Sequence, residues 1–147
     1  MKTDFYLAHP ISKRHMIRDE LQRPLQELGY VVKNPFYDED FQPRQDVDDI
    51  DEGRAVLYDI TPARAREIVK GDLDAIDSAE SIIVYLPWPS IGTSMELFYA
   101  SHVKNKYSLT VTTNDLKLHP WIETYSDVKP NTVAEILAVI WKEDTGE

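Results

Sequence analysis

Cysteine is missing from this sequence of 147 residues. Its absence excludes disulfide bonds, thiolate metal sites and cysteine nucleophiles. No segment comes near the roughly 18 consecutive apolar residues that a membrane-spanning helix needs. The first ten residues, MKTDFYLAHP, carry charge where a signal peptide has its apolar region. These absences predict a cytoplasmic protein without membrane contacts.

Basic residues are scarce as well. The chain has 16 Lys and Arg against 26 Asp and Glu, which gives a formal net charge of −10. DNA and other polyanions are repelled by such a chain, so no nucleic acid polymer is expected as a partner. A small anion can still bind in a local basic pocket. The length fits one domain, residues 1–147, with a sizeable hydrophobic core.

Strand-like and helical patterns alternate along the chain. Strands are expected at 4–8, 30–36, 81–87 and 107–113, with a short fifth at 121–125, and helices at 12–29, 61–79, 92–105 and 131–143. The alternation predicts an α/β sandwich with a mostly parallel sheet of about five strands. Ligands of such sheets bind beyond the carboxyl ends of the strands. Three segments lie at such ends: 8–14, 38–52 and 87–93.

Local signals mark the ends of the expected helices. Ser12 is a plausible N-cap of the first helix, Pro24 is expected to kink this helix and Gly29 to end it. Thr61, which precedes a proline, predicts the start of the second helix. This second helix is either continuous or broken near Gly71.

The segment 38–52 holds eight acidic residues and one basic residue, Arg44. A solvated surface loop is favoured over a metal site. The spacing of a calcium loop fails, because Ile50 occupies a ligand position and no glycine follows it. A mobile lid over a pocket is a further alternative.

Glu96 is the first candidate for chemistry. It is expected in the first turn of a helix on which Ser90 or Thr93 acts as the cap and Gly92 permits a tight turn. Free amides at a helix start favour a negative charge, so the carboxylate is expected to stay ionised, as a nucleophile must. The alternative is an acid that only complements the helix dipole.

Asp72 is the second candidate. On a continuous helix it shares one stripe with Ile68, Ile76 and Ala79, and so interrupts an apolar face. A buried carboxylate without a partner is costly, so an acid there needs a partner or a function. The alternative is a capping acid at a helix that restarts after Gly71.

A third candidate site is the start of the first helix, where Ser12, Lys13 and Arg14 follow the first strand. A hydroxyl, two cations and free amides are typical of a phosphate site. The glycines of a Walker or dinucleotide motif are missing. Solvated cations at a helix start are the alternative. The histidines have no carboxylate at metal-ligand spacing, so neither a metal nor a cofactor is expected.

Two carboxylates and an anion site together suggest substitution at a sugar carbon. The transition state there resembles an oxocarbenium ion, which a nearby anion stabilises. One acid would attack C1′ while another group protonates the departing base. Trp88 and Trp121 are either core residues or aromatic walls of a base pocket.

Three segments, FYLAHP, IVKGDLDAIDSAESIIVYL and PSIGTSMELFYA, resemble in this order the nucleoside 2-deoxyribosyltransferase family, which includes 5′-monophosphate N-glycosidases. The resemblance covers the chain to about residue 113. It implies a flavodoxin-like three-layer sandwich. It also implies a homo-oligomer in which the C-terminal region of a neighbouring subunit completes the pocket.

The resemblance also implies roles for individual residues. Glu96 matches the family nucleophile, which forms a covalent glycosyl-enzyme intermediate. Asp72 matches the acid placed near the base and the sugar. Tyr6 matches the tyrosine on the first strand that orients the nucleophile and the sugar.

Ser90 departs from the pattern of transferases that act on free nucleosides, which usually carry aspartate six residues before the nucleophile. In the 5′-monophosphate N-hydrolases, a serine in P-S-x-G contacts the phosphate. Serine tolerates a phosphate dianion, whereas aspartate would repel it. The candidate substrate-binding residues are Ser90, Gly92, Thr93, Ser12, Lys13, Arg14 and His9.

The favoured function is cleavage of the N-glycosidic bond of a (deoxy)nucleoside 5′-monophosphate through a covalent intermediate on Glu96, with release of the free base. A nucleoside 2-deoxyribosyltransferase that exchanges bases on deoxyribose is the alternative. A non-catalytic nucleotide-binding protein is a further one.

Overall fold

The computed structural model describes residues 3–44 and 61–146 of the chain. In these ranges the centre is a parallel sheet of four strands in the order β2-β1-β3-β4. The strands are β1 (Thr3–Ala8), β2 (Val32–Lys33), β3 (Ala79–Leu86) and β4 (Tyr107–Thr112). The predicted α/β architecture is confirmed, but the prediction of about five strands is wrong.

The first helical segment is a succession of short turns. They are a 3-10 turn (Ile11–Lys13), α1 (Arg14–Ile17), a π-helical turn (Arg18–Gln22) and α2 (Arg23–Glu27). The π turn changes the hydrogen-bond register just before Pro24, which therefore lies near the start of α2, where its missing N–H is tolerated. Ser12 is not an N-cap, because the 3-10 turn already begins after Pro10. Gly29 ends the segment with a φ of 97°, as predicted.

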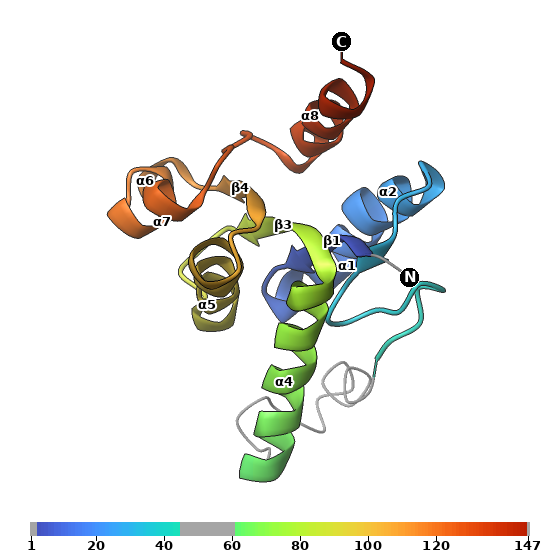
Figure 1. Ribbon diagram of the computed structural model, residues 1–147, viewed down its shortest axis with the longest axis vertical. Helices are drawn as coiled ribbons and strands as arrows, with labels where there is room; N and C mark the ends of the chain where they lie inside the picture. Colours follow the sequence, from blue (N-terminus) through green and yellow to red (C-terminus); the bar gives the residue numbers. More distant parts are fainter. Residues whose placement is uncertain (1–2, 45–60, 147) are drawn as a thin grey trace.

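The helix α4 (Pro62–Ser78) begins as predicted, because the Thr61 side chain accepts a hydrogen bond from the backbone N–H of Arg64. It continues without a break through Gly71. Its N-terminal half extends away from the sheet (Figure 1). In the described part of the chain, neither α4 nor any other helix is long and apolar enough to cross a membrane.

The second half of the chain adds α5 (Ile91–Phe98), its π-helical continuation (Tyr99–Val103), α6 (Asn114–Lys117), α7 (Pro120–Tyr125) and α8 (Val133–Thr145). The strand expected at 121–125 is wrong, because this segment is α7. Pro120 occupies the first turn, and the His119 side chain accepts from the backbone N–H of Trp121. The segment beside β4 is instead the one that contains Val128, which makes a single parallel bridge to Leu109.

Helices cover both faces of the sheet and make a three-layer sandwich (Figure 1). One face packs against α1, α2 and α8, and the other against α4, α5 and α7. Because side chains alternate along a strand, Phe5 and Leu7 of β1 point to the first face and Tyr6 and Ala8 to the second. Tyr6 is thereby placed on the same side as the helices that carry Glu96 and Asp72.

Candidate active site

The predicted ligand segments after β1 and β3 meet at the carboxyl edge of the sheet. The two strands are hydrogen-bonded neighbours, with Ala8 opposite Val84. The Lys13 ammonium lies over the ring of Trp88, 5.4 Å from its centroid. Trp88 is 41% exposed, so it is not a core residue. The edge of the site therefore combines a cation and an aromatic ring.

Glu96 reaches this edge from α5. The buried Tyr6 hydroxyl donates a hydrogen bond to Glu96 Oε2. Ser90 is the residue before α5, so Glu96 lies in the second turn and the first turn contains no acid. The prediction that Glu96 lies in the first turn is wrong. The alternative that Glu96 only complements the helix dipole loses its support, because the effect of the dipole fades beyond the first turn.

The protonation of Glu96 also differs from the expectation. Burial raises the pKa of Glu96 to about 8; the Tyr6 hydrogen bond opposes this rise, and the charge of Asp72 adds to it. Near pH 7 the carboxyl group is therefore mostly protonated. Burial and the neighbouring carboxylates raise the pKa of Tyr6 well above its usual value, so Tyr6 remains a neutral donor.

Asp72 faces the same site from α4. Because α4 is continuous, the alternative of a capping acid at a restarted helix is wrong. Burial raises the pKa of Asp72 to about 6, and the positive charge of Arg44 opposes the rise. The two acids thus titrate on either side of neutral pH, so the pair carries one proton near pH 7.

Arg44 is a functional candidate that the sequence did not single out for the site. Its Nε donates to the backbone carbonyl of Asn34 at 2.7 Å. Its charge lowers the pKa values of both Asp72 and Tyr6, so it lies within electrostatic reach of both groups. The only signal in the sequence was its place as the one base among eight acids in 38–52. Residues 45–52 of that segment lie outside the described residues. The predictions of a solvated loop or a lid for this segment therefore stay predictions.

Ser90, Gly92 and Thr93 form the start of α5. Ser90 makes no side-chain bond to the helix backbone, and its hydroxyl donates to Thr93 Oγ1 at 3.1 Å. Gly92 has no positive φ, so the expectation that it permits a tight turn is wrong. A Cβ atom at Gly92 would meet no atom within 4 Å, which shows that the space there is open.

The candidate residues after β1 differ in exposure. Ser12 is exposed and Lys13 half-buried, whereas Arg14 is buried and donates from Nη1 to the carbonyl of Ile11 at 2.9 Å. His9 is buried against the ring of Phe36. Burial lowers the pKa of His9 to about 3, so its ring is neutral and supplies no charge for a phosphate. Direct substrate contacts by Arg14 and His9 stay predictions.

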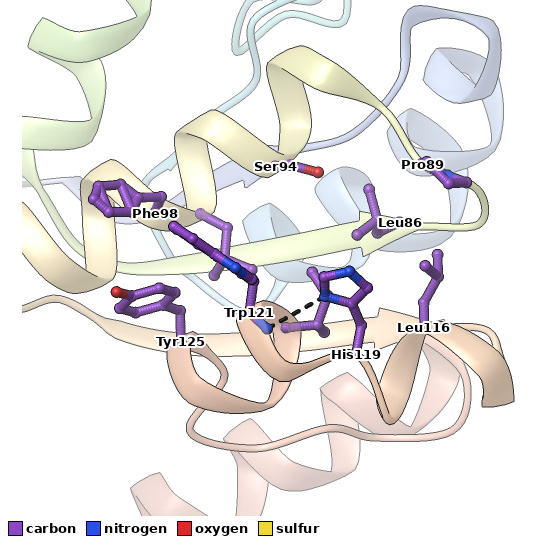
Figure 2. A pocket seen from close by; sticks show the side chains of 10 residues that line it. Leu86, Pro89, Ser94, Phe98, Leu116, His119, Trp121 and Tyr125 are labelled. Carbon is purple, nitrogen blue, oxygen red and sulfur yellow. Dashed lines mark hydrogen bonds between the residues drawn. The ribbon is translucent and has the colours of Figure 1, made fainter.

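A separate apolar cavity of about 300 Å³ lies between α5 and α7. Figure 2 shows Phe98, Trp121 and Tyr125 gathered on one side of it and His119 opposite Pro89. The ring centroids of Phe98 and Trp121 are 6.0 Å apart. Trp121 is 61% exposed, so it belongs to this groove and not to the core.

Comparisons with known proteins find similar structures. No family model matches the sequence, and no curated protein matches it. A 2-deoxyribosyltransferase from Bacillus psychrosaccharolyticus aligns with a TM-score of 0.56 at 18% identity, over 91% of this chain and 90% of its own. A 2-deoxyribosyltransferase from Leishmania mexicana aligns with a TM-score of 0.51 at 20% identity, over 76% of this chain and 65% of its own. A CMP N-glycosidase from Clostridium botulinum aligns with a TM-score of 0.55 at 19% identity, over 94% of this chain and 97% of its own. The chain therefore has the flavodoxin-like fold that the resemblance implied, and shares it with 2-deoxyribosyltransferases and a CMP N-glycosidase.

Proposed function

We propose that this protein is an enzyme that cleaves the N-glycosidic bond of a (deoxy)nucleoside 5′-monophosphate, with water as the final acceptor. The observation that supports this most is the partly buried hydrogen bond from the Tyr6 hydroxyl to the Glu96 carboxylate, with Asp72 beside it. A half-buried acid with a donor on one oxygen and a second acid nearby is suited to covalent catalysis at a sugar carbon.

In the first half of the reaction, the ionised Glu96 carboxylate attacks C1′ and forms an ester with the sugar. The bond from C1′ to the base nitrogen breaks, and its electron pair stays with the base, which receives a proton from Asp72. In the second half, water gives a proton back to Asp72 and attacks C1′, which frees Glu96 and the sugar phosphate. Tyr6 holds one Glu96 oxygen, so that the other is directed at the sugar.

A 5′-phosphate is supported by the groups around Ser90. The neighbouring segment contributes the exposed Ser12 hydroxyl and the Lys13 ammonium, and the start of α5 carries no acid that would repel a dianion. One of the structural neighbours acts on CMP, which is a nucleotide. The other two are transferases, so exchange of bases on deoxyribose is the second candidate function.

A screen for base release tests the proposal. Purified protein is incubated with deoxyribo- and ribonucleosides and their 5′-monophosphates, with and without an excess of a second base, and products are measured by mass spectrometry. We expect free base from at least one monophosphate in both conditions. A new nucleoside or nucleotide formed efficiently with the second base would favour the transferase, and a panel that stays intact throughout would contradict both functions.

We also propose that the chain forms a homo-oligomer through the groove beside α5. Trp121, which lines this groove, is 61% exposed, and Ile91 and Met95, which stand four residues apart on α5, are 83% and 67% exposed. Exposed apolar side chains of this size are typical of an interface. Sedimentation velocity should show a dimer or larger species, and Met95→Asp should shift it toward monomer by placing a charge in the interface. A wild-type protein that sediments as a monomer at micromolar concentration would contradict this assembly.

A further inference from the structure

Residues 34–44 form a hairpin that returns the chain to the carboxyl end of β2. Tyr37 and Pro43 form an antiparallel bridge. The backbone N–H of Asp38 donates to the carbonyl of Gln42 at 2.9 Å, and the Asp38 carboxylate accepts from the N–H of Gln42 at 3.0 Å. The hairpin is therefore closed by its own hydrogen bonds, although it belongs to an acid-rich segment.

Buried amide side chains fix this hairpin to the first helical segment. Gln22 and Asn34 are 0% and 1% exposed, and Asn34 Nδ2 donates to Gln22 Oε1 at 2.9 Å. Gln22 Nε2 donates to the carbonyl of Asp38 at 2.9 Å, and Gln26 Nε2 donates to that of Glu39 at 2.9 Å. Buried amides are costly unless they are paired, and a fully paired network is rigid. The chain thus holds the hairpin in one place.

The end of the hairpin places Arg44 beside the strand that carries Tyr6. Tyr6 is in register with Lys33 of β2, and Arg44 Nε donates to the carbonyl of the next residue, Asn34. Adjacent strands are about 4.8 Å apart, so the guanidinium lies at the edge of the site on the β2 side. Among the residues that the structure describes, none accepts a hydrogen bond from its two terminal nitrogens, Nη1 and Nη2. Within that part of the chain, both nitrogens are left for an acceptor on the substrate.

We propose that Arg44 binds a carbonyl oxygen of the substrate's base and so selects carbonyl-bearing bases over adenine. This inference rests on the proposed function of the same site. The phosphate candidates Ser90 and Lys13 lie at the ends of β3 and β1, whereas Arg44 approaches from β2 and acts on Asp72, the residue assigned to the base. The base is therefore the part of the substrate that Arg44 reaches.

The chemistry of the guanidinium explains the selection. It only donates hydrogen bonds, which a carbonyl oxygen accepts and the exocyclic amino group of adenine does not. When the glycosidic bond breaks, the electron pair moves onto the base and charge spreads to its carbonyl oxygens. A fixed cation at that position stabilises the transition state more than the ground state.

Base discrimination by Arg44 variants tests this inference. kcat/KM is measured for the deoxynucleoside 5′-monophosphates of cytosine, thymine, guanine and adenine with wild type, Arg44→Gln and Arg44→Lys. We expect wild type to prefer the carbonyl-bearing bases, and Arg44→Gln to lower kcat/KM for them by about 10- to 100-fold with little change for adenine. Arg44→Lys should fall between the two, because it keeps the charge but loses the fork of donors.

Arg66→Gln, which removes an exposed arginine from α4, is the matched control and should behave as wild type. Equal losses for adenine and for the other bases in Arg44→Gln, or no loss relative to the control, would overturn the inference. If wild type cleaves nothing, the proposed function fails. Calorimetric titration then measures the binding of the same nucleotides to wild type and the Arg44 variants, which tests the role of Arg44 separately. Preference for carbonyl-bearing bases in binding, lost in Arg44→Gln and kept in Arg44→Lys, would then support it, and binding without preference would overturn it.

Discussion

Base release by a Glu96→Gln variant is expected to fall by about 10⁴-fold or more, because the amide cannot form the ester with C1′. Tyr6 can still donate to the amide oxygen, so the geometry of the site should survive. The rate is measured as free base per enzyme with the best substrate of the screen. Rapid quenching of the wild-type reaction, followed by peptide mass spectrometry, should find the sugar phosphate on the peptide that contains Glu96.

Glu20→Gln is the matched control, since Glu20 is an exposed glutamate in the first helical segment. It should leave base release unchanged. Activity of Glu96→Gln within tenfold of this control would show that Glu96 is not the nucleophile.

The same Glu96→Gln protein should be more stable than wild type at high pH. The pKa of Glu96 is about 8 in the folded protein against an ordinary value of 4.5. Below pH 4.5 the Glu96 carboxyl group is protonated in both the folded and the unfolded protein. Between pH 4.5 and pH 8 only the unfolded chain releases this proton, so wild type loses stability as the pH rises. The loss amounts to roughly 3–5 kcal/mol by pH 9. Urea unfolding of both proteins at pH 5 and pH 9 measures it, and an equal difference at the two pH values would contradict the raised pKa.

Sequence patterns predicted which strand ends meet, whereas the role of Tyr6 came from the family resemblance. The strand–helix alternation predicted a parallel sheet, and the rule that ligands bind at the carboxyl ends of strands directed attention to the segments after β1 and β3. The Lys13–Trp88 contact shows that these two segments do meet. Residue spacing also placed Asp72 in a stripe with the buried Ile76, which a continuous α4 supports.

Other features depend on the fold and were not readable from the sequence. A short apolar run such as 121–125 fits a strand or a helix equally well, and Pro120 with the His119 cap decided for α7. The protonation of Glu96 follows from its partial burial at the edge of the sheet, whereas its position along the chain suggested an ionised group. Arg44 reaches the site only because a hairpin returns to Asn34, and that contact spans ten residues.

Replacing Asp72 by asparagine is expected to lower kcat/KM by about 10²- to 10³-fold and to change the shape of the pH profile. In wild type the pair Glu96 and Asp72 carries one proton between about pH 6 and pH 8, the pKa values of the two groups. The reactive arrangement has that proton on Asp72 and leaves Glu96 ionised. Wild-type kcat/KM should therefore follow a bell with limbs near these two values.

In Asp72→Asn only Glu96 titrates, and its pKa should fall because the charge of Asp72 no longer raises it. The residual activity should then rise with pH and reach a plateau, without the alkaline limb. Asp74→Asn is the matched control, because Asp74 lies on the same helix but is exposed and paired with Lys70 at 2.6 Å. It should keep the full bell. An alkaline limb that persists in Asp72→Asn would show that another group gives the departing base its proton.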